Sequence, residues 1–179
     1  MKKQLIASLV GGLILFLWQF LSWSMLNVHA SEFQYTANQD QIMENLTQNL
    51  EEGSYFIPGV PPGASDAEHQ AAMENSIGKP WATISYHKSM NMNMGMNMFR
   101  GFTADVLAAF FLVWLLMKFS TLDMKTAVFA ALALGGASYI TTAYLDSIWF
   151  ESSSIGDLID TIVQWGLVGV WLGWWLPRN

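Results

Sequence analysis

Four long apolar segments dominate the chain, and one long polar stretch separates the first from the other three. The first runs from Leu5 to Leu26 without a charged residue, and the second, from Gly101 to Met117, contains one acid, Asp105. The third and fourth run from Thr126 to Leu145 and from Ile155 to Leu176. A helix of roughly 20 apolar residues can cross a bilayer because it satisfies its own backbone hydrogen bonds. The pattern therefore predicts four transmembrane helices.

The first apolar segment follows Lys2 and Lys3, as the core of a secretory signal does, and Val28-His29-Ala30 resembles a cleavage site. Signal cores are typically about 7–15 residues long, which is shorter than this segment. We therefore expect residues 1–26 to be an uncleaved signal anchor that forms the first transmembrane helix.

The polar stretch at residues 27–99 has the alternating pattern of a small α+β domain. It is marginal in size for independent folding without disulfides or a metal, so we expect it to form a cap on the membrane domain or to fold against a partner. Ser65-Asp66-Ala67-Glu68 has the spacing of a helix capping box. The expected elements are a helix at 38–52, a strand at 54–57, a turn-rich connector at 58–63, a helix at 65–76 and a strand at 81–87.

Charge sorts to opposite sides of the predicted spans. Basic residues lie where the two termini and the connection between the second and third spans would meet, whereas acids gather in residues 27–99 and at the other ends of the last two spans. Positively charged loops face the cytoplasm. The pattern thus predicts cytoplasmic termini and a periplasmic cap. The basic residues in question are Lys2, Lys3, Lys118, Lys125 and Arg178.

The expected fold class is therefore a membrane all-α protein, with a four-transmembrane-helix bundle and a small α+β periplasmic cap inserted between helices 1 and 2. Residues 100–179 would hold helices 2–4. The 53% hydrophobic and 12% charged composition agrees with a protein in lipid. The net charge of −6 argues against a nucleic-acid binder, and the absence of Cys excludes disulfides and thiolate metal sites.

The layout as a whole resembles a group of uncharacterised small bacterial inner-membrane proteins. The resemblance rests on Leu-Ser-Trp-Ser-Met-Leu at 21–26 with His29 soon after, on Glu52-Gly53-Ser54-Tyr55-Phe56-Ile57-Pro58, and on the capped helix, the Trp81 strand and three further spans. It implies four transmembrane helices with a periplasmic loop domain after the first, in the bacterial inner membrane. It implies no activity, and the Met-rich string departs from the pattern of the group.

The Met-rich string alternates Met with Asn or Gly, so an extended chain would project its thioethers to one face. Thioethers are soft ligands that select Cu(I), and a nearby imidazole could add a nitrogen ligand. The alternative, which we favour, is that these flexible side chains fill an irregular seam. A helical conformation would remove the argument for one face. The candidate Cu(I) ligands are His87, Met90, Met92, Met94, Met96 and Met98.

Four acids, Asp105, Asp146, Asp157 and Asp160, fall near the outer ends of the last three spans. Ionisable groups inside a membrane are candidates for a proton or cation pathway. We favour structural roles, because Ser154 to Asp157 has the spacing of a second capping box and acids suit the N-terminal end of a helix. Only Gln19 and Gln164 bring polarity deeper into the spans.

Small residues recur at helical spacing in the last two spans, and such rows let helices approach closely in lipid. They would pack the four spans together or dock a partner subunit. Trp18, Trp114 and Trp165 exceed the needs of the interfacial belts and would face lipid, neighbouring helices or a quinone-like or pigment-like ligand. The candidate packing or interface residues are Ala127, Ala131, Gly135, Gly166, Gly169 and Gly173.

No phosphate loop, HExxH, haem-attachment motif or nucleophile elbow occurs, and His29 and His87 are expected to be surface or hydrogen-bonded residues rather than ligands. We therefore expect no enzyme and no cofactor, although a bound lipid, quinone or pigment remains open. The leading hypothesis is an accessory or assembly subunit of a larger bacterial inner-membrane complex, for example an energy-transducing one, with other membrane subunits and the bilayer as partners. The alternatives are a periplasm-facing copper-binding protein and a small transporter or channel.

Overall fold

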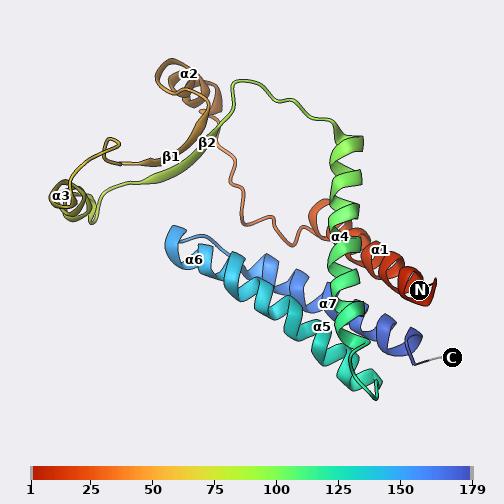
Figure 1. Ribbon diagram of the computed structural model, residues 1–179. Coiled ribbons are helices and arrows are strands. Elements are labelled where there is room, and N and C mark those ends of the chain that lie inside the picture. Colours follow the sequence, from red (N-terminus) through yellow and green to blue (C-terminus); the bar gives the residue numbers. More distant parts are fainter. Residues whose placement is uncertain (1, 178–179) are drawn as a thin grey trace. The chain divides into compact units, whose positions relative to one another are not determined.

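The computed structural model describes residues 2–177, so Arg178 of the predicted basic set lies outside the described residues. The described residues divide into two compact units, 2–34 with 92–177, and Tyr35–Asn91. The first unit contains four helical segments that are long and apolar enough to cross a membrane, as the sequence predicts (Figure 1). These segments are α1 (Lys2–Ser24), α4 (Met94–Leu116), Met124–Phe150 and α7 (Ile155–Trp175).

The first unit is built from two helix pairs, α1 with α4 and the Met124–Phe150 segment with α7, which meet where α1 packs against α7. Its apolar core is aliphatic and includes Leu15, Leu112 and Leu172, all of them buried. The first and last spans also meet near the chain ends, where the Trp175 Nε1–H donates to the carbonyl oxygen of Lys3 at 3.3 Å. The end of the bundle that contains Lys3 and Trp175 is called the terminal end below, and the opposite end is called the His29 end.

Helix α4 begins at Met94 rather than near the predicted Gly101. The Asn93 side chain caps it, since its Oδ1 accepts a hydrogen bond from the Met96 backbone N–H at 3.0 Å. The capping Asn and the good helix propensity of Met let the helix begin inside the Met-rich string. Met94, Met96 and Met98 therefore lie on a helix, which removes the argument for one thioether face that an extended string would have supported.

The third span continues beyond the predicted Leu145 and changes helix type on the way. It comprises α5 (Met124–Tyr139), a π-helical stretch η1 (Ile140–Tyr144) and α6 (Leu145–Phe150). Around the π-helical stretch, the hydroxyls of Thr141 and Thr142 donate to the carbonyl oxygens of Ala137 and Ser138, both at 2.7 Å. Such back-bonding is typical of bent or widened helices. The span ends where Glu151 adopts a left-handed backbone conformation.

Small residues bring α5 and α7 into close contact. A Cβ atom added to Gly169 would lie 2.7 Å from the Cα of Val128, and one added to Gly173 would lie 2.8 Å from the Sδ of Met124. Gly135 receives the indole of Trp165 in the same way. Together with buried Ala127 and Ala131, these glycines form an internal seam of the bundle. The groove on α7 that could have docked a partner is thus filled by α5.

The second unit contains the α+β elements that the sequence predicts. They are α2 (Gln39–Asn49), β1 (Gly53–Ile57), α3 (Asp66–Ser76) and β2 (Ala82–Tyr86), and α2 ends earlier than the predicted residue 52. The strands pair antiparallel from Gly53 opposite Tyr86 to Ile57 opposite Ala82. The capping box of Ser65 and Glu68 is confirmed. Inside this unit the Tyr86 hydroxyl donates to the Thr47 hydroxyl at 3.2 Å.

The α5–α7 seam predicts that two glycines of α7 respond differently to the same substitution. Gly169→Ala should lower the free energy of unfolding in detergent micelles by about 1–3 kcal/mol, because the added methyl overpacks a backbone contact. Gly166→Ala is the matched control, since its Cβ would lie 4.0 Å from Leu132 and meet no obstruction. The control should be neutral or gain up to about 1 kcal/mol of helix propensity. Equal effects at both positions would contradict the seam.

Candidate functional site

Asp160 of α7 is the centre of a buried hydrogen-bond cluster at the His29 end of the bundle. Its Oδ1 accepts a bond from the Trp18 indole N–H at 2.9 Å and another from the Ser22 hydroxyl at 2.5 Å, both from α1. Its Oδ2 lies 2.9 Å from the Nε2 of His29, in the segment that follows α1. The carboxylate of Asp160 therefore joins the first and last spans, and we call Trp18, Ser22, His29, Glu32 and Asp160 the Asp160 cluster.

Neighbouring side chains surround His29, and the residue is only 5% exposed. Its Nδ1 lies 2.6 Å from the Oε1 of Glu32, and its ring stacks on Trp23 with centroids 4.0 Å apart and planes 6° from parallel. Gly156 of α7 lies against the same imidazole, where an added Cβ would come within 2.7 Å of Nδ1. His29 is thus hydrogen-bonded, one of the two states expected for it, but it is buried rather than at the surface.

The surroundings of His29 favour its protonated form. Burial alone would lower the pKa of the imidazole, but the hydrogen bonds to Asp160 and Glu32, and the charges of both carboxylates, outweigh burial. The net effect raises the pKa above its usual value of 6.5. The imidazolium then donates to both carboxylates, so that one positive charge lies between two negative ones.

A second polar group connects α1 with α4. The Gln19 side-chain N–H₂ donates to Asp105 Oδ1 at 3.0 Å and reaches Gln164 Oε1 at 3.4 Å. Asp105 is 8% exposed, and its Oδ2 is buried without a hydrogen-bond partner among the described residues. The two glutamines that bring polarity into the predicted spans thus face each other and a buried acid.

A cavity of about 250 Å³ opens beside these groups, between α1, the third span and α7. It is lined by acids, amides, hydroxyls and aromatic rings, with no Lys or Arg among the lining residues. The Gln19 side chain both lines the cavity and donates a hydrogen bond to Asp105, which is not among the lining residues. Its lining residues are Gln19, Trp23, Gly135, Ser138, Tyr139, Thr142, Ala143, Asp157, Asp160, Thr161, Gln164 and Trp165.

The four acids expected near the membrane interface take different places. Asp105 and Asp160 are buried, Asp157 lines the cavity, and Asp146 is exposed on α6. The expected capping box at Ser154 is wrong, because the Ser154 side chain makes no cap hydrogen bond and its hydroxyl pairs with that of Tyr139 at 3.1 Å. Helix capping therefore does not explain the acids at the start of α7.

The Met-rich string does not present the single thioether face on which the copper alternative depends. All of its Met side chains are exposed, and those from Met94 onward follow the turns of α4. His87, the expected nitrogen ligand, lies 3.4 Å from Glu52 Oε1 and 3.3 Å from the Ser85 hydroxyl. Among the described residues no group of three or more His, Cys, Asp or Glu side chains could hold a metal ion.

Two of the three surplus tryptophans belong to the site. Trp18 binds Asp160, and Trp165 packs on Gly135 and lines the cavity. Trp114 is exposed on α4, with the Lys118 ammonium 5.1 Å from its ring centroid.

Comparison of the chain with family models, with curated proteins and with solved structures finds no match.

The raised pKa of His29 predicts a pH-dependent stability. The ion pairs of the imidazolium contribute fully to the free energy of unfolding below pH 6.5, the usual pKa of histidine. This contribution is lost as the pH rises through the higher pKa of His29 in the folded state. Melting temperatures in detergent should therefore fall between pH 6.5 and 9 in the wild-type protein. His29→Gln should flatten this slope, whereas His69→Gln, at an exposed position, should keep it. Identical slopes for both variants would contradict the assignment. The carboxylates that face His29 are Glu32, Asp157 and Asp160.

Proposed function

We propose that this protein is a non-enzymatic accessory or assembly subunit of a larger bacterial inner-membrane complex. The observation that carries the proposal is the poor coverage of the third span. Only 11% of the most apolar window of Met124–Phe150 is buried, against 28–33% in the other three spans. The third span therefore lies at the edge of the bundle, with most of its circumference free for a neighbour.

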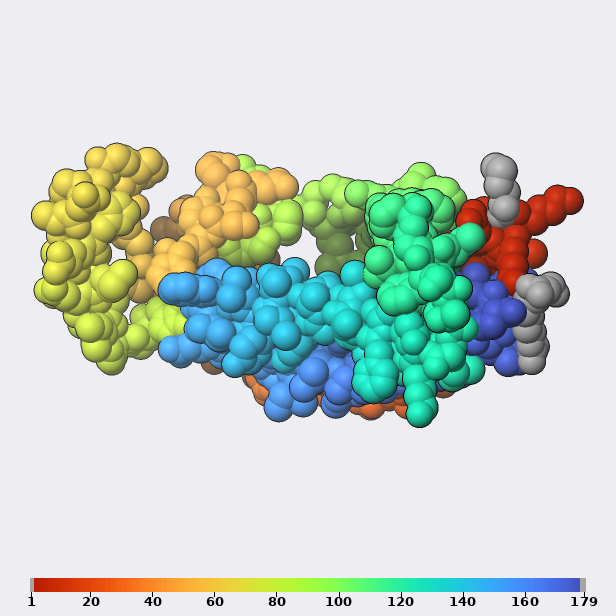
Figure 2. Space-filling model, turned by 60° about the horizontal axis from the view of Figure 1, so that its bottom comes forward, coloured from red at the N-terminus to blue at the C-terminus, as the bar shows by residue number. Residues whose placement is uncertain are grey.

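Part of the uncovered side of this span is made of small residues, beside bulky side chains such as Phe129 and Ile140. Ala133, Ala137 and Thr141 are exposed at helical spacing, and a Cβ added to nearby Gly136 would meet no atom within 4 Å. Figure 2 displays the surface of the third span in green to blue. Small residues let a second helix approach closely in lipid, where no hydrophobic force drives association. We call Ala133, Gly136, Ala137 and Thr141 the outer small face.

The exposed side of α4 differs in character and serves as an internal comparison. It carries bulky side chains, among them Leu107, Phe111 and Trp114. Bulky apolar side chains suit contact with lipid tails, whereas the small side chains of the outer small face let a second helix approach closely. This contrast favours a helix of a partner subunit, rather than lipid alone, as the neighbour of the third span.

The hydrogen bonds of the Asp160 cluster support a non-enzymatic role. Both carboxylate oxygens of Asp160 and both ring nitrogens of His29 are engaged within the cluster. A general base or nucleophile needs a group directed at a substrate. The cluster therefore holds α1 and α7 together, in line with the structural role that the sequence analysis favours for these acids.

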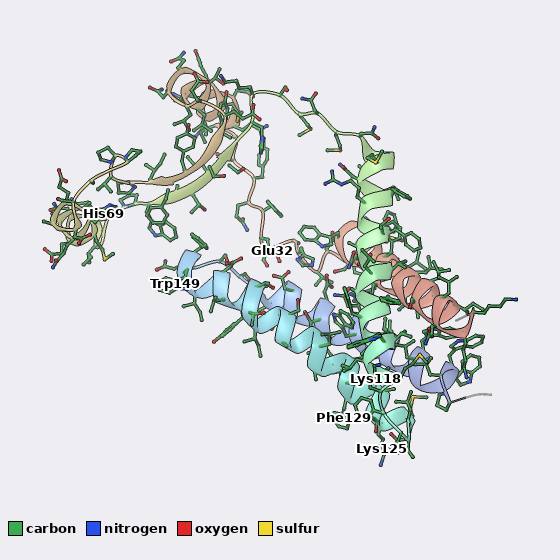
Figure 3. The ribbon with its side chains drawn as sticks, viewed as in Figure 1. Glu32, His69, Lys118, Lys125, Phe129 and Trp149 are labelled. Atoms are coloured by element: carbon green, nitrogen blue, oxygen red, sulfur yellow. The ribbon has the colours of Figure 1, made fainter. Side chains whose placement is uncertain are left out.

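For the orientation we propose cytoplasmic termini and a periplasmic second unit. Lys118 and Lys125 lie at the terminal end of the bundle, and Glu32 and Trp149 lie at the His29 end (Figure 3). Basic residues favour the cytoplasmic side of an inner membrane. The charge at the two ends of the bundle thus supports this orientation.

Cysteine labelling tests the orientation with a matched pair of exposed loop serines in a chain that has no native Cys. Ser153→Cys, between α6 and α7, should react with a membrane-impermeant maleimide in intact cells. Ser120→Cys, between α4 and α5, should react only after the cells are opened. The reverse pattern would invert the proposed topology.

The subunit role is tested by bulk on the outer small face. Ala137→Ile should reduce the yield of a stoichiometric partner, co-purified in mild detergent from the native membrane, by about tenfold, because close helix approach depends on small side chains. The melting temperature of the isolated variant should stay unchanged, because Ala137 is exposed in the bundle.

Phe111→Ile on the exposed side of α4 is the control and should keep the partner. The subunit role would be overturned by a wild-type protein that purifies alone, by an Ala137→Ile protein that keeps its partner, or by a photo-crosslink from residue 137 to a second copy of this chain.

A further inference from the structure

We propose that the cavity between α1, the third span and α7 is a binding site for a small organic ammonium ion. This site is separate from the outer small face and does not depend on the subunit role. The inference rests on the charge balance of the cavity, on the aromatic and hydroxyl groups of its wall, and on its size.

The charge balance leaves the cavity with an excess of negative charge. Asp157 and Asp160 line it, and Glu32 lies within electrostatic range of Asp157. Even a protonated His29 offsets only one of these three carboxylates, and no Lys or Arg lines the cavity. Negative charge that is removed from water without a partner is costly. A cationic ligand in the cavity would supply the missing charge.

Asp157 is the carboxylate that is available to such a ligand. Asp160 is engaged by donors from α1 and by His29, whereas no hydrogen bond to the Asp157 side chain from another described residue is found. Asp157 lies in the first turn of α7, at the rim of the cavity. It can therefore accept an N–H bond from a ligand without breaking the Asp160 cluster.

A second unsatisfied acid lies just behind the wall. Asp105 is buried, and its Oδ2 has no hydrogen-bond partner among the described residues. Gln19 connects it to the cavity, since this side chain lines the cavity and donates to Asp105 Oδ1. The polar chain of Asp105 and Gln19 thus extends the polar groups of the site behind its wall.

The rest of the wall suits an organic cation. Trp23, Tyr139 and Trp165 contribute aromatic rings, and a cation within about 6 Å of such a ring is attracted by its quadrupole. Ser138, Thr142 and Thr161 contribute hydroxyl oxygens that can accept N–H bonds. This combination of rings, hydroxyls and one free carboxylate is typical of amine recognition rather than of a metal site, which needs several converging oxygen ligands.

Size and charge also distinguish among sources of an ammonium group. A volume of about 250 Å³ accepts a small molecule, below the usual range of drug-sized ligands. A phospholipid headgroup would bring its phosphate close to Asp157 and Glu32 with no basic residue in the lining to offset it. A free amine has no phosphate and avoids this repulsion, so the geometry favours a free amine as the ligand. In both cases the group that the site recognises is an ammonium.

The test uses benzylamine, which is cationic at pH 7, and benzyl alcohol, a neutral molecule of the same shape. The full-length protein is placed in phosphatidylglycerol nanodiscs, and binding is measured by titration calorimetry and by the shift in melting temperature. Asp157→Asn removes the free carboxylate, and Ser138→Leu fills the cavity without changing charge. Asp146→Asn is the matched control, because Asp146 is an exposed acid outside the cavity.

Benzylamine should bind and raise the melting temperature, whereas benzyl alcohol should not. Asp157→Asn should weaken benzylamine binding by about tenfold, as expected for the loss of one close charge pair. Ser138→Leu should abolish binding, and Asp146→Asn should leave it unchanged. Retained melting transitions would show that both cavity variants fold.

Equal binding of benzyl alcohol would overturn the proposal, because an apolar cavity would then explain the data. The same stabilisation by NaCl or KCl at equal concentration would overturn it in favour of an inorganic cation. Wild-type affinity in both cavity variants would also overturn it. Addition of phosphatidylethanolamine to the nanodiscs distinguishes the two sources of the ammonium group. Competition between this lipid and benzylamine indicates a lipid headgroup, whereas a lack of competition indicates a free amine. Either result supports an ammonium site.

Discussion

A carboxylate that is buried between apolar helices is costly unless hydrogen bonds fill its acceptor capacity, and Asp160 meets this constraint by binding α1 and the segment that follows it. The donors come from Trp18 and Ser22, one helical turn apart on α1, so the rotation of α1 about its axis is set by this contact. His29 can reach Asp160 only if the chain turns back after α1, and Gly156 leaves the space for its ring. The arrangement of the His29 end follows from this one acid.

The opposite side of α7 depends on shape rather than on charge. Gly169 and Gly173 allow the backbone of α5 to approach, and dispersion contacts across this seam replace the hydrophobic force that is missing in lipid. One helix thus carries two different kinds of attachment, a polar one to α1 and a close-packed one to α5. The third span depends almost entirely on the second of these, which explains why so much of its surface stays uncovered.

The predictions from sequence were accurate where one local pattern decides the outcome. The spans, the two strands and the Ser65 capping box each depend on residues that are neighbours in the chain. The alternation in the Met-rich string left its conformation open between an extended chain and a helix, and Asn93 caps a helix there. Local capping, not periodicity, decides the conformation of this segment.

The buried cluster was missed for a different reason, because Asp160 lies more than a hundred residues from the other members in the chain. A signal was nevertheless present. Trp18 and Ser22 place polar groups one turn apart on a mostly apolar span, which marks a helix face that needs a partner. Which acid would supply that partner depends on how α1 packs on α7, and pattern analysis of one chain does not contain this information.

The π-helical stretch at Ile140–Tyr144 has a consequence for the third span. A π turn holds one residue more than an α turn, so it shifts the phase of the helix by about 100°. The stripe that contacts α7 before Tyr139 therefore does not continue along α6, and the third span directs a different set of side chains toward its neighbours beyond this point. Thr142 and Ala143 lie within the widened turn and line the cavity. The part of the cavity wall that Thr142 and Ala143 form is thus produced by a local insertion in the helical repeat. Deletion of one residue there would restore a regular stripe and move these two side chains away from the site.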